Sequence, residues 1–555
     1  MCNVILRELS QICHKIESSH FFTFKFKFFL EQTSLVLSTR PFFILHQQLF
    51  RYSHRMSFGK RVVLGFTVIV LVVSAMLTQS CRKEVFRDKG ALEFSTDTLS
   101  FDTVFTQLAS TTRFFKIYNK ESKSVKISSI RLLDLQTDAP FRMNVDGITG
   151  KQFSDVEIPG KDSIYVFVEV TVKNPQNPNN PFVITDIVEL LTNGVTQNVV
   201  LEVWGQDAYY HKGEIYQNGQ TVTWTNDKPH IILASGFPGV GVDEGATLNI
   251  QSGCKIFSGN NTGLFVYGTL NAQANSWNDS IVFRGLRLES FYRDKPAQWW
   301  GIIFGRNTSL IARLNLQRVV VNESFFGIAD EYIFNLAFQQ MVFPNTLLKN
   351  YTSTTASKLN LTQCIVKNAQ NTALFALNAE VNAVNCLFHT TGSNVAALAL
   401  GGIYNLNHCT IYNTGGRFLE HKQEALLIAD KIVAIEDNAL YGGVLTTQIS
   451  NTIVWGSLDN EFRFTDDADA IRFDHCLIKL KQDSATKYSS KFVDCKFNDQ
   501  PRFKDVSKED FTPSDSLGSP LIDAGFFGGT PAANNIDLFD RSRNGTPDIG
   551  ALEGK

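Results

Sequence analysis

The sequence predicts an all-β protein in which a β-sandwich is followed by a right-handed parallel β-helix. The first observation is that short runs of alternating apolar and polar residues, separated by Gly, Asn and Pro, fill the chain from residue 92 onward. The second is a pattern in the C-terminal half that recurs about every 22 residues. Segments before residue 81 follow neither pattern.

Composition excludes several classes of protein. The chain has 555 residues, of which 43% are hydrophobic and 19% charged, as in folded proteins rather than disordered or polytopic membrane proteins. Residues 81–555 hold 43 Lys and Arg against 51 Asp and Glu. This mildly acidic body argues against nucleic acid as a partner.

One segment is apolar enough to enter a bilayer. It runs from Val62 to Met76, follows Lys60-Arg61 and precedes Ser80-Cys81. A basic region, a short apolar stretch and a small residue before a cysteine follow the order of a signal peptide, whereas a spanning helix needs about 20 residues. We therefore assign residues 56–80 to a signal peptide, with a retained signal anchor as the alternative.

The Ser80-Cys81 junction resembles the lipobox of bacterial lipoproteins, in which the cysteine becomes acylated. The resemblance implies that Cys81 carries a lipid, that the membrane is a partner, and that the protein is an outer-membrane lipoprotein on the surface or periplasmic face. Thr78 stands where the family prefers Leu. Residues 1–55 precede a suitable start at Met56, so we interpret them as a misassigned extension, with a genuine extension as the alternative.

Residues 81–212 are expected to form a sandwich of about seven strands. Alternating runs at 114–118 and 164–172 are bounded by turn residues, and Asn193-Gly194 predicts a hairpin turn. The order of these runs resembles Hydin-like immunoglobulin-type domains of bacterial surface proteins. That resemblance implies a spacer or packing partner.

The repeat places an apolar residue three positions before a cysteine and another two positions after it, as in Leu406-Cys409-Ile411. We call the central site of the repeat the cysteine position. It is occupied by Val319, Met341, Cys364, Cys386, Cys409, Thr452, Cys476 and Cys495.

Stacked coils explain such a period. One strand-bearing coil per repeat, about 4.8 Å from the next, makes a solenoid whose apolar columns align. Parallel crossovers are right-handed, so residues 213–500 are expected to form a right-handed parallel β-helix. Asn345, Asn368 and Asn413 lie four residues after the cysteine position and predict an asparagine ladder.

Two stretches carry a family resemblance. Residues 245–273, with QWWGIIFG at 298–305, resemble the start of pectate-lyase-like β-helix proteins. SPLIDAG at 519–525, with residues 537–553, resembles the closing segment of secreted bacterial β-helix proteins. The resemblance implies that residues 501–555 close the β-helix. Because the family includes lyases and adhesins, it does not decide the chemistry.

The cysteines are expected to point inward as small apolar side chains, because Val, Met and Thr share their position. A disulfide between stacked neighbours such as Cys364 and Cys386, or a metal site, is the alternative.

Aromatic residues near one loop are candidate ligand contacts. Phe291, Tyr292 and Trp299 have the apolar ring surface that stacks on sugars. Trp300 is expected to start a core strand, so its neighbour Trp299 is expected to point to the outer face.

His408 and His475 each precede a cysteine position, and both are expected to point outward in one stripe about three coils apart. The acidic run Asp466-Asp467-Ala468-Asp469 lacks further convergent oxygens, so we expect a solvated loop and assign no cofactor; calcium is the alternative. Charged residues between Asp537 and Asp548 are expected to form ion pairs, again with calcium as the alternative.

No general acid–base pair emerges from the motifs. The sequence therefore favours a noncatalytic binding or adhesion module for carbohydrate, with the ligand along the β-helix flank. The alternative is a polysaccharide lyase acting on uronate-containing glycans, and whether the protein is an enzyme stays open.

Overall fold

The computed structural model describes most of the chain from Phe86 onward. The described residues are 86–135, 141–173, 182–305, 311–338, 356–434, 437–464, 470–481, 486, 488–527, 535–543 and 545–554. The expected signal peptide, Cys81, Asn345 and the acidic run Asp466–Asp469 lie outside them. The chain separates into the compact units Met1–Arg87 and Asp88–Lys555, the second of which contains every described strand. In the described part, no helix has the length and hydropathy of a membrane span.

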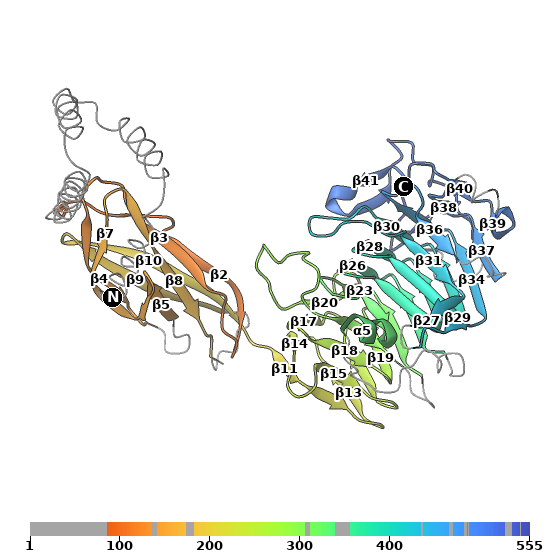
Figure 1. Ribbon diagram of the computed structural model, residues 1–555, viewed down its shortest axis with the longest axis horizontal. Helices are drawn as coiled ribbons and strands as arrows, with labels where there is room; N and C mark the ends of the chain where they lie inside the picture. Colours follow the sequence, from red (N-terminus) through yellow and green to blue (C-terminus); the bar gives the residue numbers. More distant parts are fainter. Residues whose placement is uncertain are drawn as a thin grey trace, which may run out of the picture. The chain divides into compact units, whose positions relative to one another are not determined.

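Two five-stranded sheets pack face to face over residues 93–206 (Figure 1). Their orders are β1-β3-β8-β5-β6 and β2-β10-β9-β4-β7. Every pairing is antiparallel except that of β2 with β10. The strands are β1 (Glu93–Phe94), β2 (Thr98–Phe105), β3 (Arg113–Asn119), β4 (Val125–Leu132), β5 (Phe141–Val145), β6 (Ile148–Gly150), β7 (Gln152–Ile158), β8 (Asp162–Val170), β9 (Phe182–Thr192) and β10 (Val195–Gln206).

Alternation along these strands builds their core. Phe115 and Val166 of one sheet and Leu201 of the other are fully buried in the same apolar cluster. The predicted turn at Asn193-Gly194 is present, and both residues have positive φ (52° and 78°), as a tight hairpin turn requires. The alternating runs at 114–118 and 164–172 therefore correspond to β3 and β8.

Parallel strands make up most of the described chain between Tyr209 and Phe497 and stack coil upon coil. The eleven-stranded sheet comprises β11 (Tyr209–Lys212), β14 (His230–Leu233), β17 (Lys255–Ser258), β20 (Ile281–Gly285), β23 (Val319–Val321), β26 (Ile365–Ala369), β28 (Leu387–Thr391), β30 (Thr410–Asn413), β35 (Ile453–Gly456), β38 (Leu477–Ile478) and β40 (Lys496–Phe497). Because β11 pairs with β14, the stack of parallel strands already includes residues 209–212.

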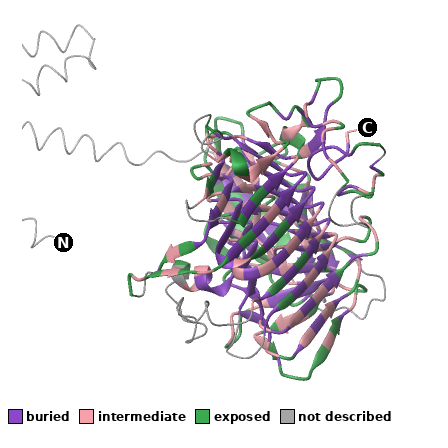
Figure 2. Cartoon of the chain, turned by 90° about the vertical axis from the view of Figure 1, so that its right-hand side faces the viewer, coloured by how far each residue is buried: buried purple, intermediate pink, exposed green. Residues whose placement is uncertain are grey.

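The seventeen-stranded sheet lines the other two walls of the same core, as two parallel stacks that are joined by the long strands β27 (Leu374–Val384) and β29 (Ala396–Asn407). It comprises β12 (Glu214–Tyr216), β13 (Thr221–Trp224), β15 (Gly239–Val242), β16 (Thr247–Ile250), β18 (Gly263–Val266), β19 (Thr269–Gln273), β21 (Gly301–Phe304), β22 (Arg313–Gln317), β24 (Ile328–Asp330), β25 (Lys358–Thr362), β27 (Leu374–Val384), β29 (Ala396–Asn407), β31 (Leu426–Ala429), β34 (Leu445–Ser450), β36 (Phe462–Phe464), β37 (Ala470–Asp474) and β39 (Phe492–Val493). The two sheets share one apolar cluster, and buried residues alternate with more exposed ones along the stacked strands (Figure 2).

Short elements lie outside these sheets. They are α5 (Glu331–Phe338), the pair β32 (Lys431–Val433) and β33 (Leu440–Gly442), the pair β41 (Phe503–Asp505) and β42 (Asp510–Pro513), and single turns of 3-10 helix at Ser489–Lys491 and Val506–Lys508.

The cysteine position faces the core, as predicted. Cys364, Cys386, Cys409 and Cys476 are buried in the shared cluster, and Cys495 is half-buried against it. All of the described cysteines are free thiols, so the disulfide alternative is wrong for them. Burial raises the pKa of Cys386 and of Cys476, which keeps both protonated and apolar in character.

A left-handed residue precedes every cysteine position that the structure describes and turns the chain from one sheet into the other. These residues, which we call the turn column, are Arg318, Gln363, Asn385, His408, Asn451, His475 and Asp494, with φ between 48° and 53°. One left-handed residue reverses the alternation locally, so the apolar residue before the turn and the cysteine after it both face inward. The side chains of the turn column consequently leave the core.

An asparagine ladder is present, but not where the sequence analysis places it. Asn368 donates to Asn322 (3.0 Å) and Asn413 donates to the carbonyl of Thr391 (2.9 Å), while Thr390 occupies the equivalent site of the coil between them. A continuous ladder instead runs along the seventeen-stranded sheet at distances of 2.8 to 3.3 Å. It comprises Asn249, Asn271, Asn315, Asn360, Asn382 and Asn405.

Candidate functional site

The expected outward position of Trp299 is wrong. The side chain is 1% exposed, its Nε1 donates to the carbonyl of Asn322 (2.8 Å), and its ring lies 6.3 Å from that of Phe283. Strand β21 starts only at Gly301, whose φ of 118° interrupts the alternation, so Trp299 and Trp300 are both buried. Trp299 is part of the core and contacts no outer surface.

The expected open stripe of histidines is also wrong, because the C-terminal segment covers it. His408 leaves the core but is fully buried. Burial and the charge of Arg543 lower the pKa of His408, and backbone groups of Asp548 and Gly550 oppose this effect. The side chain of His475 is 25% exposed and its ring lies 4.6 Å from that of Phe526.

Phe526 and residues 535–543 lie along the turn column and pair with its side chains. Asn451 accepts from the backbone amide of Phe526 (2.9 Å) and donates to its carbonyl (3.1 Å). Asn385 donates to the carbonyl of Ile536 (2.9 Å). Arg318 forms a bidentate ion pair with Asp540, the closer contact being 2.6 Å. The segment thus covers coils that lie far apart in sequence.

The expected ion pairs of the closing segment are present. Arg543 contacts Glu553 (3.0 Å) with both side chains buried, and it also donates to the side chain of Asn385 (3.1 Å). Arg541 pairs with the buried Asp537 at 2.6 Å. Burial raises the pKa of Glu553, which the charge of Arg543 opposes. These groups fix the segment against the coils.

A groove opens beside this covered region, over the outer face of β26, β28 and β30. Its volume is about 670 Å³, within the range of small-ligand sites. It is lined by Ser290, Arg293, Asp294, Asn368, His389, Thr390, Tyr412, Thr414, Gly415, Gly416, Arg417, Phe418, Leu419, Val506, Ser507, Glu509 and Phe511. We call this the flank groove.

The floor of the flank groove is formed by residues that the pairing of β26, β28 and β30 places side by side. Lys367, His389 and Tyr412 are paired partners on three successive coils, so their side chains form one outward column. Lys367 forms ion pairs with Asp294 (3.5 Å) on one wall and with Glu509 on the other. This lysine therefore ties both walls to the floor.

His389 is the buried member of that column. It is 1% exposed, its Nδ1 lies 2.9 Å from the hydroxyl of Thr390, and its ring lies 5.0 Å from that of Phe511. Burial, with a smaller contribution from Lys367, lowers the pKa of His389 to about 3. The imidazole is consequently neutral at physiological pH and a weak base.

The loop 286–298 forms one wall and carries two of the predicted aromatic residues. Glu323 anchors it: this buried carboxylate accepts from Arg284 (2.8 Å) and from the backbone amide of Asp294 (3.0 Å). Phe291, 53% exposed, lies 5.2 Å from Tyr292 and 6.3 Å from Phe418, measured between ring centres. Phe291 and Tyr292 therefore lie at the edge of the groove.

Charged and aromatic groups alternate around the opening. Arg293 and Arg417 are exposed, and the Arg417 guanidinium lies 4.9 Å from the centre of the Phe418 ring. Asp294 and Glu509 supply carboxylates beside them. Such a lining offers donors and acceptors for hydroxyl groups together with apolar surface for a ring.

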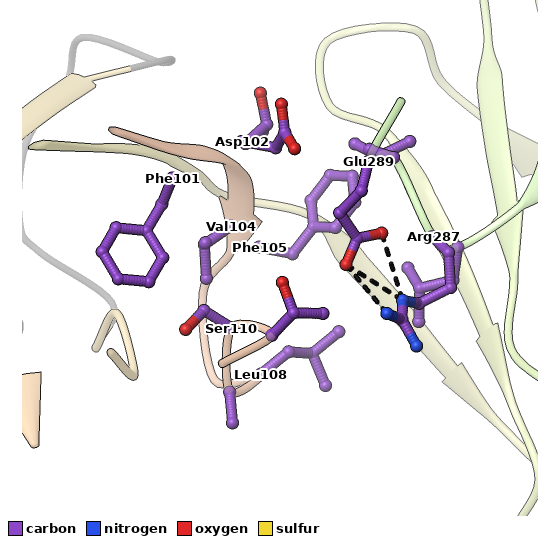
Figure 3. Close-up of a pocket in the computed structure, with 13 residues that line it drawn as sticks. Phe101, Asp102, Val104, Phe105, Leu108, Ser110, Arg287 and Glu289 are labelled. Carbon is purple, nitrogen blue, oxygen red and sulfur yellow. Dashed lines mark hydrogen bonds and ion pairs between the residues drawn. The ribbon is translucent and has the colours of Figure 1, made fainter. Parts of the chain in front are cut away.

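A second hollow does not fit a ligand of that size. It lies between residues 101–111 and residues 286–289 (Figure 3) and has a volume of about 110 Å³. Arg287 and Glu289 pair with each other at 3.0 Å on one of its walls. Nor do the described residues hold any group of three or more His, Cys, Asp or Glu arranged to bind a metal ion.

Sequence reasoning missed most of the flank groove. Its lining comes from segments around residues 290, 390, 415 and 507, which no spacing rule connects. The column on the floor of the groove could have been predicted from the repeat, because Lys367, His389 and Tyr412 each stand three residues after a cysteine position. The asparagine ladder could also have been predicted, because asparagine recurs between apolar residues in TLNI, TLNA, RLNL and KLNL.

Comparison with known proteins gives no assignment. No protein-family model and no curated protein matches the chain. Solved structures with partial similarity include the VesB protease of Vibrio cholerae (10% identity, 21% of this chain and 31% of that chain, TM-score 0.15). Another is a family 123 glycoside hydrolase from Clostridium perfringens (6% identity, 22% of this chain and 26% of that chain, TM-score 0.14). A third is the major pilin subunit BcpA of Bacillus cereus (10% identity, 23% of this chain and 44% of that chain, TM-score 0.15). The matches thus span less than half of those chains.

Proposed function

We propose that the protein is a lipid-anchored protein of the bacterial cell envelope that binds carbohydrate in the flank groove without transforming it. In this proposal the stacked parallel strands are a right-handed β-helix of the pectate-lyase-like kind. Residues 93–206 are an immunoglobulin-type spacer between the lipid on Cys81 and the binding region. Right-handedness follows from the general rule for parallel crossovers.

The lining of the flank groove supports carbohydrate as the ligand. Arg417, Asp294 and Glu509 line the groove together with Phe418, and Phe291 lies at its edge 6.3 Å from Phe418, so hydrogen-bonding groups and apolar rings occur at one hollow. A pyranose presents hydroxyl groups at its rim and C–H groups on its faces, and this lining complements both.

One observation favours binding over lyase chemistry. A lyase needs an accessible base near neutral pH to take the proton beside a carboxylate. The imidazole on the floor of the groove, His389, is buried and has a pKa of about 3. Arg293 and Arg417 could hold an acidic sugar, but they do not supply that base.

The test is binding of the full chain to an array of immobilised glycans. Arg417→Ala and Phe418→Ala should each reduce binding of the recognised glycan about tenfold, since each removes a contact from the groove. Lys422→Ala is the matched control, because Lys422 is an exposed cation of the same segment that pairs with Glu420 (2.6 Å) outside the groove. Full binding by both groove variants would contradict the proposal.

The lyase alternative predicts a different signal. On a panel of uronate-containing polysaccharides, with and without calcium, cleavage by elimination would give unsaturated products that absorb in the ultraviolet. We expect no such rise. A rise that disappears in Arg417→Ala would replace the binding proposal with the enzymatic one.

Anchoring is tested separately through Cys81. Cys81→Ala should leave an uncleaved precursor that incorporates no radiolabelled palmitate. Incorporation equal to that of the unaltered protein would exclude Cys81 as the lipid site and leave the groove proposal untouched.

A further inference from the structure

An aromatic patch lies on the outer face of the sheet that contains β3, β8 and β5, far from the flank groove in sequence. Phe114, Tyr165 and Phe167 are 50%, 38% and 37% exposed. Large apolar side chains usually turn inward from a half-buried sheet, and the strict alternation of β3 and β8 makes these three point outward.

Register brings the three rings into one cluster. Phe114 is the paired partner of Phe167 on the neighbouring strand, and their ring centres are 5.9 Å apart. Tyr165 lies two residues from Phe167 on the same face, with nearly parallel rings 5.7 Å apart. The cluster is therefore continuous apolar surface rather than scattered residues.

Polar groups border the rings on a hollow of about 390 Å³. Its lining includes Thr112, Arg142, Asn144, Thr149, Phe167 and Glu169. Across the sheet Phe114, Phe167 and Asn144 share one row, and Glu169 and Arg142 share the next. Glu169 accepts from Thr112 (2.6 Å) and lies 3.5 Å from Arg142, so the charges at this site are paired.

We propose that this face is a second carbohydrate-binding site, for an uncharged glycan stacked on Phe114 and Phe167 with its hydroxyl groups toward Asn144, Thr149 and Glu169. A flat protein partner would have to bury the Arg142–Glu169 pair without replacing its contact with water, which is costly. Sugar hydroxyls replace that water with hydrogen bonds. The hollow is of a size that holds a small saccharide.

The site is independent of the flank groove and differs from it in charge. Arg142 and Glu169 neutralise each other, whereas the groove opens between exposed arginines. Lys116 adds a cation 4.5 Å from the centre of the Tyr165 ring. Binding at the sheet face should still change little between low and high salt, because the uncharged glycan itself carries no charge to be screened.

The experiment is affinity electrophoresis of the full chain in gels that contain glucan, mannan, galactan or xylan. The double variant Phe114→Ala/Phe167→Ala should weaken retardation by the recognised polymer at least about tenfold, and Phe114→Tyr should keep it, because the ring is retained. Trp204→Ala is the matched control, since Trp204 is 45% exposed on the outer face of the other sheet. Circular dichroism checks that each variant is folded.

The variants separate this inference from the groove proposal. Loss of retardation in the Phe114→Ala/Phe167→Ala variant but not in Arg417→Ala supports a site on the sheet. Loss only in Arg417→Ala overturns the sheet site and leaves the groove proposal standing. Retardation by none of the four polymers, or an equal loss in Trp204→Ala, also overturns the inference.

Discussion

The turn column and the flank groove are neighbouring regions on the outside of the same coils, and each contains a buried neutral histidine. His408 and His389 are both at most 1% exposed and both have a lowered pKa. What differs is the space beside them. His408 faces the packed closing segment, whereas His389 faces a hollow of about 670 Å³. The two histidines therefore share burial and a lowered pKa, and only the one in the groove has open space beside it.

The largest expected difference between the two regions comes from removing an arginine. Arg543→Met in the covered region should lower the free energy of unfolding by about 3–5 kcal/mol, because Glu553 is left buried without its partner. Arg417→Met in the groove should change it by about 0.5 kcal/mol or less, since Arg417 is exposed. Urea unfolding measures both. Equal effects would mean that the two regions do not differ in packing.

Acid should destabilise the protein through the histidine of the groove. The pKa of His389 is about 3 in the folded chain and about 6.5 when unfolded, so the unfolded state binds the proton more readily. The stability that neutral His389 contributes is present above pH 6.5 and is lost as the pH falls toward 3. Between pH 7 and 4.5 the loss should be about 2–3 kcal/mol.

His389→Gln isolates that contribution, because glutamine does not titrate. Its urea midpoint should fall less between pH 7 and 4.5 than that of the unaltered chain. The pKa of His408 is lowered as well, so part of the acid effect should remain in this variant. An unchanged pH dependence would show that His389 is not neutral in the folded protein.

A smaller effect is expected from the amide that fixes the closing segment. Asn451→Gly keeps a residue able to adopt φ of 48° but removes the hydrogen bonds to Phe526 and to the side chain of Asn407, at a cost of about 1–3 kcal/mol. Asn261→Gly is the control, because Asn261 is exposed and has a similar φ of 57°. Thermal unfolding compares the two. A control as damaging as Asn451→Gly would attribute the effect to glycine itself.

The smallest effect is expected inside the coils, where both regions share one core. Cys409→Val should cost about 1 kcal/mol or less, because the fully buried Val319 already occupies the equivalent position. Cys409→Asp should be far more damaging, since it buries a carboxylate among apolar layers. Rapid reaction of Cys364, Cys386 and Cys409 with a thiol probe in the native protein would contradict the inward packing.

Local patterns predicted the strands and the core better than they predicted the outer surface. The cysteine position was correctly placed inward because alternation and period act within a single coil, as Leu406-Cys409-Ile411 shows. His408 and Trp299 were misplaced because their exposure depends on segments distant in sequence or on one left-handed glycine. Phe291 and Tyr292 were placed on the right loop, but not next to Phe418, 127 and 126 residues further along the chain.

The return of the C-terminal segment along the turn column sets an order of events during synthesis. The partner of Arg318, Asp540, is made only 222 residues later. The next coil, whose strand pairs with the one before Arg318, is complete by Thr362, long before Asp540 is made. A chain that is made from its N-terminus must therefore expose a row of uncovered turns until its last residues arrive. Premature termination near residue 525 would leave not one incomplete coil but a bare strip along several of them.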